Sequence, residues 1–253
     1  MRRHALNDYQ FQKIEHFLPG SKKHVGVTAK DNRMFIDGVL WIFKTGAPWR
    51  DLPERYGHWK NVHRRFSRWS KAGIFDEIFR TLSEDADMEF LLMDGTIVKA
   101  HQHASGAKKK KNQYDNEAIG RSRGGLTSKL HCVVDGLGNP VDFILTGGEV
   151  HDSVCAIALL EGKEAEFVLA DKAYDSNNIL EKIEEMGATA VIPPKSNRIV
   201  QREYDKEHYK DRNLVERFFC RLKQFRGIAT RYCKRAEYFL EAVKLASCII
   251  LMS

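Results

Sequence analysis

The sequence predicts an α/β (α+β) protein in which a mixed sheet flanked by helices follows a small helical N-terminal domain. Three observations support this class. All four tryptophans lie within the first 70 residues, which gives that region an aromatic core of its own. Apolar runs typical of strands follow, first as a hairpin and then alternating with helical segments, an order typical of a mixed sheet covered by helices. An acidic stretch near residues 84–89 separates the two regions. We therefore expect a helical domain over residues 1–83 and a second domain over residues 88–253.

The N-terminal domain is expected to contain two amphipathic helices. The first spans residues 31–43, with Asp31 or Asn32 as its cap, and glycine and proline residues near 46–53 end it. The second spans residues 57–71 and places Trp59, Val62, Phe66 and Trp69 on one apolar face. Its opposite face carries a narrow arc of four cations, which are Lys60, Arg64, Arg68 and Lys71. Such a helix suits a DNA groove, and the alternative is an ordinary solvated face.

The second domain is expected to hold a five-strand sheet and a set of covering helices. Strands are predicted at residues 90–94, 126–134, 141–145, 167–171 and 188–192, with a hairpin connection at 135–140. Helices are predicted at residues 151–160, 176–186, 207–225 and 235–252. Segment 103–123 is rich in lysine, glycine, serine and asparagine and is expected to be a basic flexible loop between the first two strands.

Charge and composition limit the class of protein. The 253 residues have a pI near 9.1, and the basic excess is concentrated in residues 1–83, 99–129 and 195–235. A polyanion such as DNA explains separate basic blocks, although ordinary surface charge is the alternative. The five scattered cysteines form no C-x-x-C pair, and no long apolar run is present. We therefore expect a cytoplasmic protein without disulfide bonds and without a membrane partner.

Two aspartates each follow an apolar strand. Asp94 follows Phe90-Leu91-Leu92-Met93, and Asp171 follows Phe167-Val168-Leu169-Ala170. On neighbouring strands their carboxylates would repel each other unless cations lay between them, and Mg²⁺ prefers such oxygen ligands. Taken singly, each aspartate is better explained as the cap of a following turn.

The helix predicted near residue 216 places four reactive side chains on one stripe. On an ideal helix Tyr209, Arg212 and Lys223 lie within about 40° of Glu216. Glu216 is then a candidate third metal ligand, with Arg212 and Lys223 holding phosphate oxygens. The alternative is a surface ion pair between Arg212 and Glu216, which is worth a few tenths of a kcal/mol.

The pattern Tyr209-x2-Arg212-x3-Glu216-x6-Lys223 resembles the Y-(2)-R-(3)-E-(6)-K signature of bacterial insertion-sequence transposases of the DDE type. The segments at residues 94–108, 124–129 and 170–175 resemble the insertion-sequence-five group in particular, as does the N-terminal segment 46–53. One departure is Gly95, where serine is more usual in that group.

This resemblance implies a ribonuclease-H-like catalytic domain with Asp94, Asp171 and Glu216 as the catalytic, metal-binding triad. Two Mg²⁺ ions are implied, or Mn²⁺ in their place. The implied chemistry is hydrolysis of a phosphodiester bond at the end of the element, followed by transfer of the 3′-hydroxyl end to target DNA. The partners would be double-stranded DNA, as terminal inverted repeats and as target, and further copies of the chain on that DNA.

Further phosphate contacts are predicted within the basic blocks, at Lys108, Lys109, Lys129 and Lys172. Phosphate contact is likewise preferred to a zinc pair for His101 and His103, and capping of helix starts is preferred for Asp152 and Asp175. The alternative to an active transposase is a catalytically inactive DNA-binding protein of the same fold. A third hypothesis, a general nuclease, predicts cleavage without preference for terminal repeats.

Overall fold

The computed structural model describes residues 4–20, 31–106 and 117–253. The chain divides into two compact units. Unit 1 is formed from residues 1–82, 101–117 and 222–253, and unit 2 from residues 83–100 and 118–221. The expected boundaries, 1–83 and 88–253, differ from this division because the C-terminal segment packs among the N-terminal helices. As functional domains, the two predicted ranges stay a prediction.

Unit 1 is helical. Asp31, one of the two expected caps, begins α2 by accepting a 2.8 Å hydrogen bond from the Met34 N–H. Gly46 ends α2 in the left-handed region, with φ of +72°, which favours glycine. Helices α1 and α4 were not expected from the sequence. The elements of unit 1 are α1 (Asp8–Ile14), α2 (Asn32–Thr45), α3 (Trp59–Lys71), α4 (Ile74–Leu82), α8 (Arg226–Ala229), β7 (Thr230–Arg231) and α9 (Ala236–Leu251), with short 3₁₀ turns η1 (Glu15–Phe17), η2 (Trp49–Asp51), η3 (Glu54–Tyr56) and η4 (Gln102–Ser105).

The aromatic core expected for the N-terminal region is centred on Phe66 of α3. Its ring centroid lies 5.5 Å from those of both Phe43 and Trp49 and 5.6 Å from that of Phe75. The C-terminal helix adds Tyr238, 6.3 Å away. Aromatic pairs at these distances contribute attraction beyond their buried area. The first 82 residues therefore share their core with a segment more than 150 positions away in the chain.

Helix α9 belongs to this core because it is apolar on nearly all sides. Ala242, Val243, Leu245 and Cys248 lie on different sides of the helix and are all buried, and a helix of that kind must be covered by other elements. The Lys244 ammonium joins α9 to α4 by an ion pair with Asp76 at 2.7 Å. It also pairs with Glu241 at 2.9 Å. No helix within the described residues is long and apolar enough to cross a membrane.

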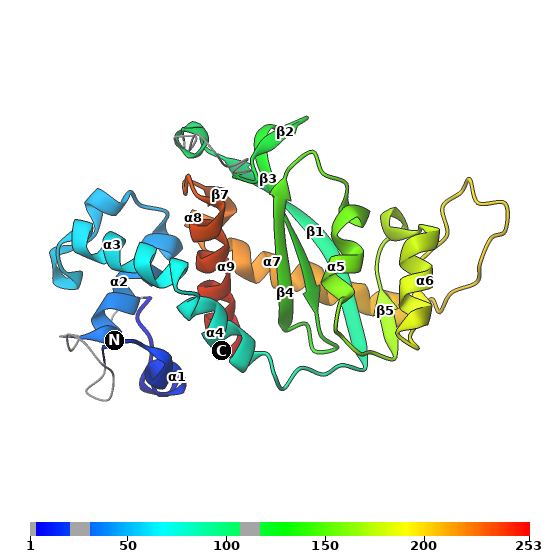
Figure 1. Cartoon of the computed structure of the whole chain (residues 1–253), viewed down its shortest axis with the longest axis horizontal. Coiled ribbons are helices and arrows are strands. Elements are labelled where there is room, and N and C mark those ends of the chain that lie inside the picture. Colours follow the sequence, from blue (N-terminus) through cyan, green and yellow to red (C-terminus); the bar gives the residue numbers. More distant parts are fainter. Residues whose placement is uncertain (1–3, 21–30, 107–116) are drawn as a thin grey trace. The chain divides into compact units, whose positions relative to one another are not determined.

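Unit 2 is built on a mixed sheet, as expected (Figure 1). Its strands lie in the order β4-β3-β1-β5-β6, and the short β2 pairs with the start of β3. Strand β1 is antiparallel to β3, and β3 to β4, whereas β5 is parallel to β1 and β6 to β5. Three antiparallel strands followed by two parallel ones confirm the ribonuclease-H-like class. The strands are β1 (Phe90–Ala100), β2 (Gly120–Ser122), β3 (Gly125–Val134), β4 (Pro140–Gly147), β5 (Phe167–Leu169) and β6 (Thr189–Val191).

Several predicted elements of unit 2 differ from the structure in detail. Strand β1 continues six residues beyond Asp94, because β3 remains beside it. The expected loop 103–123 includes η4 and β2, and its residues 107–116 lie outside the described chain. The expected helix 207–225 is divided into a 3₁₀ turn, η7 (His208–Arg212), and the helix α7 (Asn213–Lys223), and the predicted helix 151–160 into η5 (Asp152–Cys155) and α5 (Ala156–Leu160).

Helices cover both faces of the sheet. Leu91, Met93 and Val168 belong to a buried cluster that includes Leu159 of α5 and Ile179 of α6 (Asn177–Glu185). On the other face Phe218 of α7 packs against Phe143 of β4, with ring centroids 5.8 Å apart. Because side chains alternate along a strand, this second face is the one to which Asp94 belongs.

Candidate active site

Two carboxylates meet where the parallel strands β1 and β5 separate. Leu92 pairs with Leu169, and each aspartate lies two residues further along the chain, Asp94 within β1 and Asp171 just after the end of β5. Asp94 accepts a 2.8 Å hydrogen bond from the Gly95 N–H. Asp171 begins the 3₁₀ turn η6 (Lys172–Tyr174) by accepting from the Ala173 N–H at 2.7 Å. The register therefore brings Asp94 and Asp171 together, as the sequence predicted.

Negative charge is concentrated around Asp94, and the Asp94 carboxylate is largely shielded from solvent. Burial, and to a smaller extent the negative charges of Asp171 and Asp152, raise the pKa of Asp94 from its ordinary value to about 6. The Gly95 N–H and the Arg212 guanidinium act in the opposite direction. Only 20% of the Asp94 side chain is exposed. A cation placed between the two aspartates would relieve this repulsion.

The Arg212 guanidinium lies between Asp94 and Glu216. It donates to Asp94 at 3.3 Å and forms a second, shorter hydrogen bond with Glu216. Two hydrogen bonds and one guanidinium span roughly 8 Å, so the Asp94 and Glu216 carboxylates lie within about that distance. The Tyr209 ring lies beneath the same guanidinium, with its centroid 5.9 Å from Arg212 Cζ. The structure thus brings together three of the four predicted helix residues and Asp94.

The predicted stripe is not a single ideal helix. Tyr209 and Arg212 lie in η7, and Glu216 lies in the first turn of α7. In the turn that leads into η7, Asp205 accepts from the Glu207 and His208 N–H groups, at 2.8 and 3.0 Å. The i, i+4 contact from Arg212 to Glu216 nevertheless survives the change of helix type. The Glu216 side chain is 52% exposed, so it has room to turn.

A polar cluster lies on the reverse face of β1. Gly95 pairs with His131, and a Cβ at position 95 would lie 2.3 Å from Asp152 Oδ1. Glycine, the one departure from the family pattern, therefore leaves room for the Asp152 carboxylate. That carboxylate forms an ion pair with Lys129 at 3.2 Å, and burial lowers the pKa of His131 to about 4. The buried hydroxyl of Tyr174 has no hydrogen-bond partner among the described residues.

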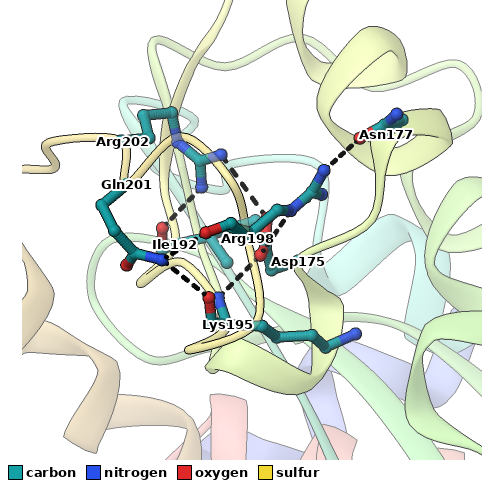
Figure 2. A network of polar contacts seen from close by, with 7 residues as sticks. All are labelled: Asp175, Asn177, Ile192, Lys195, Arg198, Gln201 and Arg202. Carbon is teal, nitrogen blue, oxygen red and sulfur yellow. Dashed lines mark hydrogen bonds and ion pairs between the residues drawn. The ribbon is translucent and has the colours of Figure 1, made fainter.

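Asp152 and Asp175 do not cap helices, so that expectation was wrong for both. His151 begins η5, and the Ser176 side chain, which precedes α6, forms no capping bond. Asp175 is instead a buried centre of ion pairs (Figure 2). In the sequence, Asp175 lies four residues after Asp171, and two arginines lie in the polar segment after Pro194. That pattern is too general to have identified the network.

The Asp175 carboxylate holds three donors. Arg198 donates to it through Nε and Nη2, each at 3.0 Å, and the Lys195 N–H donates at 2.8 Å. Arg202 adds a longer contact at 3.5 Å. Burial alone would raise the pKa of Asp175, but the bonds from Arg198 and Lys195 lower it below its ordinary value.

The predicted DNA contacts have different environments. The four cations of α3, Lys60, Arg64, Arg68 and Lys71, are all exposed, and Val62, Phe66 and Trp69 on the opposite face are buried, as the periodicity predicted. Lys172 and Lys223 are exposed, whereas the Lys129 side chain is only 11% exposed and is paired with Asp152. Lys108 and Lys109 lie outside the described residues. As DNA contacts, all of these residues stay a prediction.

A cavity of about 830 Å³ lies within unit 1. Aromatic side chains and three histidines, His63, His101 and His103, line it, and none of the three acids does. The His101 ring lies 4.9 Å from that of Tyr232, and its Nδ1 accepts from the His103 N–H at 3.3 Å. In the described part of the chain no group of three or more His, Cys, Asp or Glu side chains could hold a metal ion. The His pair therefore lacks the partners that a zinc site needs.

The donor set Asp94, Asp171 and Glu216 suits a divalent cation in chemistry, since all its donors are carboxylate oxygens. The Arg212 guanidinium now supplies the positive charge between Asp94 and Glu216. In this arrangement the three carboxylates, which are all described residues, do not form a group that could hold a metal ion.

Comparison with known proteins gives two matching family models. One, described as "Transposase DDE domain", matches residues 85–251. The other, described as "Putative transposase of IS4/5 family", matches residues 6–79. Together the two models cover nearly all of the chain.

Two similar proteins have curated descriptions. "Putative transposase for insertion sequence element IS6501" from Brucella ovis is 38% identical over 127 residues, which are 49% of this chain and 98% of that protein. "Uncharacterized protein y4sN" from Sinorhizobium fredii is 45% identical over 107 residues, 42% of this chain and 86% of that protein. A solved structure, the Mos1 transposase paired-end complex with left transposon end, is 12% identical over 93% of this chain and 81% of that chain, with a TM-score of 0.28. That score is too low to support any conclusion about the site.

Proposed function

This chain belongs to the family of transposases with a DDE domain, and from that membership we propose that it cuts and joins DNA at the ends of an insertion sequence. The substrates are the terminal inverted repeats of the element and a target duplex. Asp94, Asp171 and Glu216 are the catalytic residues. The observation that carries the proposal is the meeting of Asp94 and Asp171 at the end of paired strands, with Arg212 reaching Glu216 across the gap.

Mg²⁺, or Mn²⁺ in its place, would be held by the three carboxylates, and when bound it would supply Lewis-acid activation of the attacking water and stabilise the leaving oxygen. The β1–β5 register, which brings Asp94 and Asp171 to one corner of the sheet, supports this assignment. Glu216 joins them from α7 as Arg212 is released. Since the acids lie on three separate segments, closing the site depends on the fold of unit 2.

The reaction has two steps. In the first, water attacks the phosphorus at the end of the element, and the bond to the 3′-oxygen breaks to leave a 3′-hydroxyl and a 5′-phosphate. In the second, this hydroxyl attacks a phosphodiester of the target, and one phosphodiester replaces another without an external energy source. Arg212, freed from the carboxylates, is positioned to hold a non-bridging phosphate oxygen, and the Tyr209 ring restricts its motion.

DNA is bound by the exposed cations of α3 and by the basic residues near the carboxylates. The four α3 side chains lie opposite the buried face of the helix, which lets them approach a groove or its phosphates without disturbing the core. The reaction joins two ends in one event, so at least two copies of the chain are expected on the DNA.

Nicking of a duplex that carries the element's terminal repeat tests the proposal. We expect Mg²⁺-dependent cleavage by the natural chain and none by Asp94→Asn. Asp142→Asn is the matched control, because Asp142 lies on the same sheet but forms a partly exposed ion pair with Lys163. Equal cutting by the natural chain and Asp94→Asn would refute the assigned chemistry. Binding without cutting would favour an inactive DNA-binding protein, and cutting without preference for the repeat would favour a general nuclease.

A further inference from the structure

The segment between β6 and η7 forms a compact loop of residues 195–202, here called the 195–202 loop. It is closed on itself by the Gln201 amide, which donates to the Lys195 and Arg198 carbonyls at 3.1 and 3.0 Å. The Arg198 N–H adds a 3.0 Å bond to the Lys195 carbonyl. A loop with this many internal bonds has a defined shape.

The base of the 195–202 loop is fixed to the strand end that carries Asp171. Asp175 is buried and accepts from the Lys195 N–H and from Nε and Nη2 of Arg198 (Figure 2). Arg202 donates to the Ile192 carbonyl at 2.7 Å, and this bond holds the end of the loop against the segment that follows β6. Paired, hydrogen-bonded buried charges hold one geometry, because each alternative leaves a charge unpaired.

This anchoring places the 195–202 loop beside the carboxylates. Val191 of β6 pairs with Leu169 of β5, so both strands end at the same edge of the sheet. Asp171 follows Leu169 by two residues, and Lys195 follows Val191 by four. The chain then passes from the loop into η7, which holds Arg212. The loop therefore connects the strand edge with the segment that reaches Glu216.

The apex of the loop presents apolar side chains to solvent. Ile199 is fully exposed and Val200 is 78% exposed, although both are residues that favour burial. The same loop carries three cations, Lys195, Arg198 and Arg202, of which Arg198 and Arg202 pair with the single carboxylate of Asp175. The Lys195 ammonium makes no ion pair with any described residue, and Figure 2 shows its side chain extending out of the network.

These features fit duplex DNA better than a second protein surface. A stable protein interface buries about 800 Å² on each partner, far more than two side chains provide. DNA instead offers phosphates for the cations and sugar or base edges for apolar side chains in a groove. We propose that the 195–202 loop is a DNA-contacting surface, with Lys195 on a phosphate and Ile199 and Val200 against the groove near the scissile bond. This rests on the proposed function.

Binding of a fluorescein-labelled duplex that carries the inverted repeat adjoining the gene tests the inference, measured by anisotropy over a series of salt concentrations without Mg²⁺. We expect the double variant Ile199→Ser/Val200→Ser to bind about tenfold more weakly with an unchanged salt slope. Lys195→Gln is expected to reduce the slope by about 0.9, the loss of one phosphate contact. Leu137→Ser is the matched control, since Leu137 is also a strongly exposed apolar residue, at 68%, but lies in the β3–β4 hairpin, next to the start of β1.

Hydroxyl-radical footprints on the same duplex should lose protection next to the scissile bond in the double variant and stay unchanged in Leu137→Ser. Thermal unfolding of all three variants should match the natural chain, because the substituted side chains are solvated. Natural-like binding and footprints in the double variant and in Lys195→Gln would overturn the proposal. So would unchanged DNA binding with loss of self-association in sedimentation, which would identify a second copy as the partner. If the natural chain neither binds nor cuts the repeat, the proposed function itself fails.

Discussion

The basic face of α3 and the carboxylate site of unit 2 are both charged surfaces, but they are made in different ways. The α3 cations lie on one helix, are exposed, and depend only on helical periodicity. The carboxylates come from three segments and are partly buried, and the pKa of Asp94 is raised by burial and by its neighbours. Exposed charges are screened by salt and contribute nearly independently of one another. The pKa of a buried carboxylate, in contrast, depends on the charges beside it. The following predictions test that difference.

The largest effect is expected for Glu216→Gln. Glu216 is about half exposed, as surface residues are, yet it belongs to the carboxylate site. Because members of a catalytic unit are not additive, we expect the nicking rate to fall about 10³-fold or more, with unchanged thermal stability. Glu207→Gln is the control, since Glu207 is exposed and pairs only with Lys210 across one turn. If the nicking rate of Glu216→Gln fell by less than about tenfold, Glu216 would be an ordinary surface charge and not a catalytic residue.

The second effect concerns the stability of the fold around Asp175. Asp175→Asn removes the charge that compensates Arg198 and Arg202, and we expect a loss of about 3 kcal/mol in the free energy of unfolding. Asp142→Asn breaks a more exposed pair and should cost less than about 1 kcal/mol. The measurement is urea unfolding at neutral pH.

The pH dependence of this second effect follows from the lowered pKa of Asp175. A carboxyl whose pKa is depressed in the folded state contributes stability above its unfolded pKa of about 3.9, and loses it as pH falls through the folded value. The difference between natural chain and Asp175→Asn should therefore shrink below about pH 4. A difference that is independent of pH would attribute the loss to packing and not to charge.

The third effect is a gain of stability in Asp94→Asn without metal. The pKa of Asp94 is about 6 in the folded chain, so its ionised form is less stable there than in the unfolded chain. Above pH 6 the substitution should stabilise unit 2 by of order 2 kcal/mol, and the gain should disappear below about pH 4, where both states are protonated. Thermal unfolding in EDTA across this range is the measurement. A destabilised variant at pH 8 would show that the bond to Arg212 outweighs the cost of burial.

The smallest effects are expected on α3. Lys60→Gln and Arg64→Gln should each reduce the salt slope of DNA binding by about 0.9 and leave stability unchanged. Arg65→Gln is the informative control, because the Arg65 guanidinium lies 4.3 Å from the Phe35 ring and 4.5 Å from the Trp69 ring. It should cost about 1 kcal/mol of stability and leave the slope as it was. If Arg65→Gln reduced the salt slope and left stability unchanged, Arg65 would belong to the solvent face of this helix and not to its core face.

Local patterns predicted much of the molecule. Apolar runs located β1, β3, β4, β5 and β6. Asp31 and Gly46 bound α2 where a cap and a helix-ending glycine were expected. The signature Tyr209-x2-Arg212-x3-Glu216 identified residues that do meet Asp94 in space. Helix α4 was missed because its nine residues follow α3 after one left-handed glycine, Gly73, and the acidic stretch after it looked like a linker.

By itself, then, the sequence determined the fold class, the family, and the apolar and basic faces of α3, because each depends on residues close together in the chain or on a periodic pattern. Only the tertiary structure decided that α9 completes the N-terminal core, that Gly95 makes room for Asp152, and that Asp175 ties a distant loop to the strand carrying Asp171. Those contacts join segments that no short-range period connects, and burial and ion pairing select their partners only after the chain has folded.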